Sequence, residues 1–239
     1  MTKVIDLREQ RRRMHQKKFP PVWSYGVTTC VSRKDTLLPR TLQSLKDGGF
    51  PDPIIFEDRG FGAYANWALG MAELWFRNPS ANRYALFEDD VICCTNLRQY
   101  LDQVYMPDDE CWNLYTSPRL HPVKNVDRPE EHPQGFFPAQ NGWCLGALGL
   151  VYTNQAMRSL LSDPEFFDHA IFKQNNQDGV AGRIMTRQKI KVMVHHPSLL
   201  QHTGEESATG KCRHEYPETL ALSFISQKFD ALSLLTGVK

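Results

Sequence analysis

Short apolar segments alternate with segments of helical periodicity over residues 23–90, and this alternation restricts the possible fold more than any other feature of the chain. Segments 23–31, 52–58 and 83–90 are rich in β-branched and aromatic residues, as strands are. Segments 37–49 and 62–76 lie between them and repeat apolar residues at helical spacing. Strands that alternate with helices predict an α/β fold with a mostly parallel sheet covered by helices on both faces.

The second half of the chain has a less regular pattern. Residues 118–140 are rich in Pro, His and charge and lack periodicity, which predicts a long loop. The remaining segments predict a strand at 111–117, a Gly-rich strand leading into a helix at 141–161, a helix at 175–188, a strand at 189–204 and a C-terminal helix at 217–229.

Basic residues are concentrated at the start of the chain. Residues 1–40 hold ten Lys or Arg and three Asp or Glu, whereas the net charge of the whole chain is only +1. We therefore expect residues 1–21 to form a basic arm ahead of one domain at 22–239. Such an arm either keeps the chain in solution or contacts phosphates or another anionic surface.

The composition indicates a globular protein, with 41% hydrophobic and 23% charged residues. No window approaches about 18 uncharged apolar residues, and the N-terminus is too polar for a signal peptide. These features predict no transmembrane segment and a cytoplasmic location. The six cysteines form no CxxC pair and lie mostly in apolar runs, so we expect reduced structural thiols.

Three consecutive acids, Glu88, Asp89 and Asp90, end the strand predicted at 83–90. No Lys or Arg stands beside them in the sequence, so either water solvates these like charges or a cation lies among them. Ligands of open α/β sheets bind outside the carboxyl ends of the strands. The position of the three acids therefore predicts a site, although a solvated acidic turn is the simpler alternative.

The order of these motifs resembles that of the GT-A glycosyltransferases: a strand followed by SRK, strands ending in FED and LFEDDV, a Gly-rich strand, an Asp-led helix and PSLLQHTG. HPSLLQHTGEES (196–207) resembles a segment of the animal N-acetylglucosaminyltransferases that branch N-glycans. The resemblance covers roughly residues 22–210. It implies a single Rossmann-like GT-A domain, with a donor half at about 22–117 and an acceptor half at about 118–239.

The resemblance also implies an activity and a cofactor. The expected reaction is an inverting, metal-dependent transfer of a sugar from a nucleotide sugar, expected to be a UDP-sugar, to a hydroxyl acceptor. Mn²⁺ or Mg²⁺ would stabilise the departing diphosphate and be bound by Asp90 and His202. Asp89 and Glu88 would contact the donor. His195 and His196 are alternatives to His202, but they lie next to each other on one predicted strand and would face opposite sides.

Asp178 matches, by its place in the order of motifs, the catalytic base of the inverting members. A carboxylate within hydrogen-bond reach of the acceptor hydroxyl can take its proton. The alternative is that Asn176 or Asp178 caps the helix predicted at 175–188. Asp168 and Glu165 are the other candidate bases.

Further contacts to the donor would come from Thr28, Thr29, Arg33 and Asp58, which follow or end the first two strands. Their alternative roles are loop capping and surface charge. On the acceptor side, Trp143 is the candidate contact residue, with Phe136 and Phe137 as further aromatic side chains that could stack on an extruded base.

Two other classes of function fit parts of the pattern. A nucleotidyltransferase would use the same metal and carboxylate chemistry, but the TTCVSRKD loop (28–35) lacks the glycines expected there. A non-catalytic protein that binds sugar or nucleic acid is the second alternative. The acceptor of a transferase stays open among a glycan, a small molecule and DNA with hydroxymethylated bases, for which the basic arm could supply phosphate contacts.

Overall fold

A computed structural model describes residues 20–116, 134–139, 146–168, 177–204, 220–221 and 223–236. Its centre is a seven-stranded sheet of order β2-β1-β3-β7-β5-β8-β6. Its strands are β1 (Trp23–Thr29), β2 (Ile54–Glu57), β3 (Arg83–Glu88), β5 (Glu110–Asn113), β6 (Gly135–Pro138), β7 (Gly149–Thr153) and β8 (Lys191–His196). Strands β6 and β7 run opposite to the other five. The sheet is therefore mixed but mostly parallel, compatible with a Rossmann-like arrangement.

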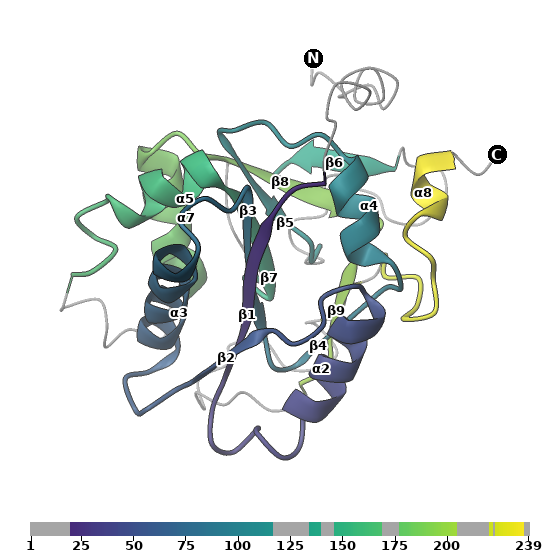
Figure 1. Ribbon diagram of the computed structural model, residues 1–239, viewed down its shortest axis with the longest axis horizontal. Helices are drawn as coiled ribbons and strands as arrows, with labels where there is room; N and C mark the ends of the chain where they lie inside the picture. The colour runs from purple at the N-terminus through teal and green to yellow at the C-terminus, as the bar shows by residue number, and fades with distance from the viewer. Residues whose placement is uncertain are drawn as a thin grey trace.

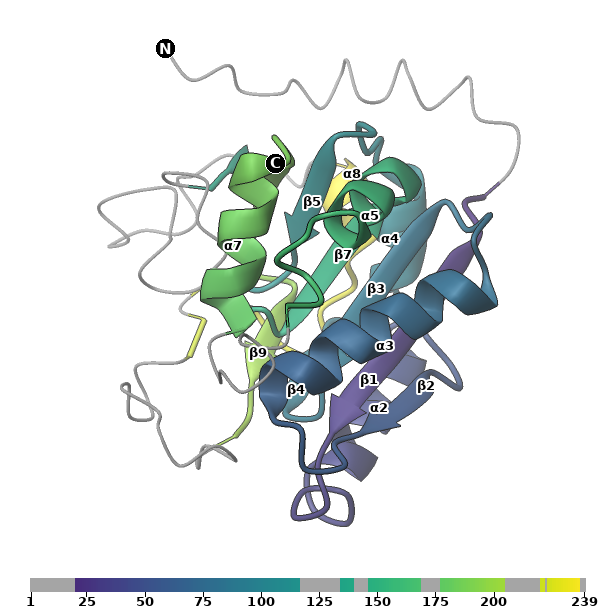
Figure 2. The same cartoon turned by 90° about the vertical axis from the view of Figure 1, so that its left-hand side faces the viewer.

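Six helices in the described ranges cover the sheet, three on each face (Figure 1). On one face lie α3 (Ala63–Arg77), α5 (Asn154–Leu161) and α7 (Gln177–Arg187), and on the other α2 (Leu38–Asp47), α4 (Leu97–Gln103) and α8 (Ser233–Thr236). Figure 2 shows α3, α5 and α7 in front of the sheet.

The central strands β3, β5 and β7 are buried on both sides because successive side chains point to opposite faces and helices cover both of them. In β3, Ala85 and Phe87 join the apolar core beneath α2 and α4, whereas Tyr84 and Leu86 join the core beneath α3, α5 and α7. A strand buried in this way reads as a continuous apolar run. This explains why residues 83–90 show no polar alternation before the acids.

A second, two-stranded sheet pairs β4 (Val91–Cys93) antiparallel with β9 (Leu200–His202). Val91 lies opposite His202 in this pairing. Only the turn of Asp89 and Asp90 separates β3 from β4. The small sheet therefore holds His202 beside the acidic turn.

Two predictions about the second half of the chain are wrong in part. The segment predicted as a loop at 118–140 includes a strand, β6, which pairs antiparallel with β8. The helix predicted at 217–229 is not formed in residues 220–221 and 223–229. There Thr95 accepts a backbone bond from Ala231 and donates one to Phe229. This pairing with a distant segment replaces the local hydrogen bonds of a helix.

Candidate functional site

The three acids lie at the carboxyl end of β3, beside the carboxyl end of the parallel strand β1. A buried hydroxyl from α2 fixes the turn that carries them: Thr41 Oγ1 lies 2.7 Å from the carbonyl of Asp89 and 2.9 Å from that of Val91, and it accepts a 3.2 Å bond from Val91 N. The backbone of the turn is therefore held by a neighbouring helix as well as by the strands on either side.

Asp89 is bound from the first strand and the loop after it. Its Oδ2 accepts a 2.6 Å hydrogen bond from Thr29 Oγ1, and its Oδ1 lies 3.0 Å from Arg33 Nη1. Burial raises the pKa of Asp89, although Thr29 and the Arg33 charge act in the opposite direction. Two of the predicted donor-side residues thus contact the acidic turn directly.

Asp90 is 2% exposed. Its Oδ2 lies 2.6 Å from Arg33 Nη1 and 3.2 Å from His202 Nε2, whereas its Oδ1 is buried and has no hydrogen-bond partner among the described residues. Burial opposes ionisation of Asp90, but the hydrogen bond from His202 and the charge of Arg33 outweigh it and lower its pKa. The structure therefore joins the two predicted metal ligands and leaves one oxygen of Asp90 unpaired.

Two residues that the sequence analysis did not consider complete this part of the site. A Cβ atom added to Gly204 would lie 2.7 Å from Asp90 Oδ2, so only glycine fits there without displacing the carboxylate. Tyr115, just after β5, is buried, and burial together with the charges of Asp178 and Asp90 raises its pKa. In the sequence, Tyr115 could have been noticed as a polar aromatic residue that shortly follows a strand.

Asp178 lies in the first turn of α7, inside the helix, so of the two residues considered as alternatives for the helix cap it is not the capping one. Its two carboxylate oxygens accept hydrogen bonds from Gly146 N, at 2.7 Å, and Ala147 N, at 2.9 Å. Burial raises the pKa of Asp178 against the effect of these two bonds. The carboxylate joins α7 to the segment before β7, and Asn176 lies outside the described residues.

Glu88 directly precedes the two aspartates of the turn and is also influenced by the charge of Asp178. It is half-buried, and Gln177 Nε2 lies 3.5 Å from its Oε1. Burial, followed by the charges of Asp90 and Asp178, raises its pKa well above the ordinary range. Glu88 therefore interacts electrostatically both with the acidic turn and with Asp178 at the start of α7.

Asp58 is bound within its own loop. Its Oδ1 accepts backbone bonds from Gly60 and Phe61, both at 2.9 Å, and from Gly62 at 3.2 Å. Thr28 Oγ1 donates to the carbonyl of Phe87 at 3.2 Å. Both side chains have structural roles here, and a contact from Asp58 to a donor stays a prediction.

The alternative bases differ from Asp178 in their surroundings. Glu165 pairs with Arg183 at 2.6 Å and Arg187 at 2.8 Å, in a network that joins α7 to the turn after α5. Asp168 is exposed. Neither residue has a described contact with the acidic turn.

The structure also places some of the aromatic residues that were expected to stack on a base and the histidines that were alternatives to His202. Phe136 is buried and stacks on Trp112 with ring centroids 4.0 Å apart, so it cannot stack on a base. His195 is enclosed between Tyr100 Oη, at 2.7 Å, and the carbonyl of Pro197, at 2.6 Å, and burial lowers its pKa to about 3. His202, whose Nε2 lies 3.2 Å from Asp90 Oδ2, is the histidine that contacts the acidic turn. Trp143 lies outside the described residues.

Other observations limit what the site can be. Among the described residues, no three His, Cys, Asp or Glu side chains are grouped to hold a metal by themselves, and no helix is long and apolar enough to cross a membrane.

Cys93, Cys94 and Cys111 are buried free thiols, as expected for structural cysteines.

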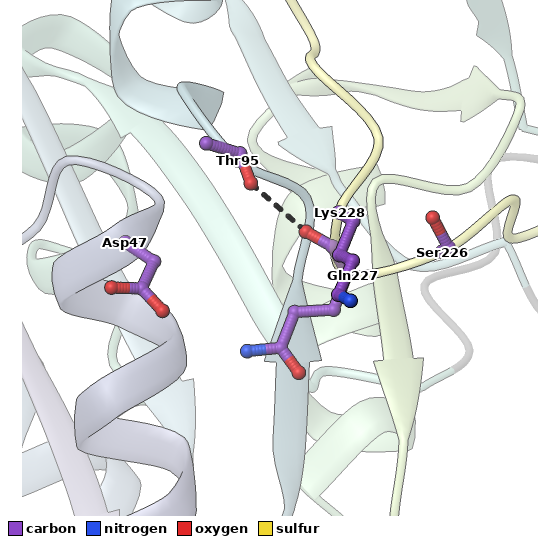
Figure 3. Close-up of a pocket in the computed structure, with 5 residues that line it drawn as sticks. All are labelled: Asp47, Thr95, Ser226, Gln227 and Lys228. Carbon is purple, nitrogen blue, oxygen red and sulfur yellow. Dashed lines mark hydrogen bonds between the residues drawn. The ribbon is translucent and has the colours of Figure 1, made fainter.

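A surface pocket of about 630 Å³ lies elsewhere on the molecule (Figure 3). It is lined by Asp47, Thr95, Ser226, Gln227 and Lys228. Asp47 ends α2, six residues beyond Thr41, which is about 9 Å along the helix axis. The pocket contains none of the predicted site residues.

Comparisons with known proteins identify no family. No protein-family model matches the chain, and no curated protein matches it. The solved structure "Crystal Structure of A197 from STIV" has a TM-score of 0.46 and 12% sequence identity, with 75% of this chain and 83% of that chain covered. A likeness at this level supports no conclusion about fold or function.

Proposed function

We propose that this protein is a metal-dependent glycosyltransferase of the GT-A type, which moves a sugar from a nucleotide sugar, most simply a UDP-sugar, to a hydroxyl acceptor. The observation that carries the proposal is the buried, unpaired Oδ1 of Asp90 beside Arg33 and His202 at the carboxyl ends of β1 and β3. An unsatisfied buried carboxylate oxygen is costly unless a ligand completes it.

The carboxylate and imidazole groups at this turn fit a hard divalent cation that also binds the phosphates of a substrate. Mg²⁺ and Mn²⁺ accept carboxylate and imidazole ligands, and sites that also use substrate phosphates need only one or two carboxylates from the protein. Asp90 and His202 would hold the ion, with Asp89 beside them. When bound, such an ion stabilises negative charge on a departing diphosphate. The absence of a three-residue metal cluster in the described ranges is compatible with this arrangement.

Asp178 is the proposed base. In an inverting transfer, the acceptor oxygen forms a bond to the anomeric carbon, the bond from that carbon to the diphosphate breaks, and the hydroxyl proton passes to a carboxylate. The amides of Gly146 and Ala147 fix the orientation of the Asp178 carboxylate, and each oxygen keeps a second lone pair for the proton. Burial raises its pKa, which favours acceptance of a proton.

Thr29 and Arg33 are the proposed contacts to the donor, because they lie at the end of β1 and in the loop that follows it. An arginine fork matches a diphosphate. We propose a cytoplasmic location and, as acceptor, a hydroxyl of a glycan, of a small molecule or of a hydroxymethylated base in DNA.

Isothermal titration of UDP with and without Mn²⁺ tests the proposal. We expect binding that requires Mn²⁺ and is lost in Asp90→Asn, while the far-ultraviolet circular dichroism of that variant stays unchanged. Products of a UDP-sugar incubation then separate the enzyme classes: UDP supports a glycosyltransferase, whereas UTP and sugar 1-phosphate, formed when pyrophosphate is supplied, indicate a nucleotidyltransferase. Binding without turnover would indicate a non-catalytic protein, and metal-independent UDP binding would refute the metal assignment.

A further inference from the structure

Arg33 forms ion pairs with both aspartates of the turn through a single nitrogen. Its Nη1 lies 3.0 Å from Asp89 Oδ1 and 2.6 Å from Asp90 Oδ2. The side chains are 14% exposed for Arg33, 4% for Asp89 and 2% for Asp90. Charges buried to this degree need a partner. The guanidinium therefore supplies the positive charge that a divalent cation would supply at the same carboxylates.

The two cations cannot be accommodated together without cost. Asp90 Oδ2 already faces Arg33 and His202, and a cation at Asp90 Oδ1 would share the same carboxylate with the guanidinium. The guanidinium and the divalent cation would repel each other because both would contact the same carboxylate, and little water is present to screen their charges. Binding of the cation therefore favours withdrawal of Arg33 from Asp90.

The local structure allows that withdrawal. Arg33 belongs to the turn region 31–37 between β1 and α2, in which most residues are exposed. Its backbone is held by a 3.0 Å bond from its N–H to the carbonyl of Cys30. A change of side-chain rotamer would therefore move the guanidinium away from the carboxylates while the backbone stays in place.

We infer that Arg33 is an internal counter-ion that competes with the divalent cation for Asp90 and is released to the donor diphosphate when cation and nucleotide bind together. The inference rests on the proposed function for its second half, the transfer to a diphosphate. Its first half, competition with the cation, stands on the ion pairs alone. The consequence is that the cation binds weakly without nucleotide, so the two ligands bind as one unit.

The test measures Mn²⁺ binding without nucleotide, from the electron paramagnetic resonance signal of free Mn²⁺, for the full chain and for Arg33→Gln. Removing one nearby competing charge should raise the affinity for Mn²⁺ about tenfold or more. Lys34→Gln is the matched control, since Lys34 lies next in the chain and pairs with Glu57 at 2.8 Å on the surface. It makes the same change of net charge, and its Mn²⁺ affinity should stay within about twofold of the unaltered chain.

Each outcome separates the inference from the proposed function. Tighter Mn²⁺ binding in Arg33→Gln, with weaker Mn²⁺-dependent binding of UDP, supports both halves. Unchanged or weaker Mn²⁺ binding in a chain that still binds UDP with Mn²⁺ overturns the counter-ion role and leaves the proposed function standing. Tighter Mn²⁺ binding without UDP binding in either chain supports the competition and overturns the release to a diphosphate.

A second variant covers the case in which Arg33→Gln does not fold. Arg33→Lys keeps a positive charge near the acids, but the lysine side chain is shorter, so its ammonium cannot approach both carboxylates as closely as Nη1 of Arg33 does. Its Mn²⁺ affinity should lie between those of the unaltered chain and a charge-free variant, a few-fold above the former. An affinity equal to that of the unaltered chain would overturn the inference.

Discussion

The hydroxyl of Thr41 should be essential for the shape of the acidic turn. Thr41 is 1% exposed, and it connects α2 to the backbone of Asp89 and Val91 on either side of Asp90. Thr41→Val keeps the size and branching of the side chain but removes one donor and one acceptor. The substitution therefore tests the hydrogen bonds and leaves the packing nearly unchanged.

The magnitude follows from the bonds that are lost. A hydroxyl donates one hydrogen bond, so it serves the carbonyl of Asp89 or of Val91 at one time, and it accepts one from Val91 N. Each buried group left unsatisfied costs about 1–3 kcal/mol, which gives a loss of about 2–6 kcal/mol for the two bonds. For a chain of this size that loss lowers Tm by about 4–24 °C.

Thermal and urea unfolding, followed by circular dichroism, measure the loss of stability, and the same protein is titrated with Mn²⁺ and UDP. We expect Thr41→Val to be less stable and to bind the metal–nucleotide pair more weakly, because the Asp89–Asp90 turn loses its support. Thr36→Val is the control: Thr36 is exposed and its hydroxyl contacts are 3.4 Å long, so its effect should stay within about 0.5 kcal/mol. Equal stability and equal binding in Thr41→Val and the unaltered chain would refute the reasoning.

Three further predictions concern other parts of the site and its support. Asp178→Asn should keep Mn²⁺-dependent UDP binding and lower transfer by about 10²–10⁴-fold; full transfer activity in a destabilised variant would show that Asp178 is only a tether. Gly204→Ala should weaken Mn²⁺-dependent UDP binding, since its Cβ would lie 2.7 Å from Asp90 Oδ2, and unchanged binding would contradict this close approach. Asp163, whose bonds to Arg187 lower its pKa to about 2, should stabilise the fold above its unfolded pKa of about 3.9 and lose that contribution as pH falls toward 2. Urea unfolding at several pH values should show a smaller loss of stability on acidification in Asp163→Asn, and an equal loss would show that other groups cause it.

Local patterns were sufficient to predict the elements from β1 to β3. The apolar segments at 23–31, 52–58 and 83–90 contain β1, β2 and β3, and α3 lies within one residue of the segment predicted at 62–76. These elements could be predicted because strand and helix periodicities are properties of neighbouring residues. The acids were correctly expected at the carboxyl end of a strand for the same reason.

The sequence by itself thus determined the elements from β1 to β3 and where the charged groups stand along them. Only the tertiary structure decided which groups meet. The pairing of β4 with β9 brings His202 to Asp90, and the loop after β1 folds back so that Arg33 reaches both aspartates. Asp178 is bound to Gly146 and Ala147, a contact that helix periodicity does not contain. The physical reason is that each of these contacts joins residues far apart in the chain, and its free energy depends on burial and charge compensation in the assembled fold rather than on any local preference.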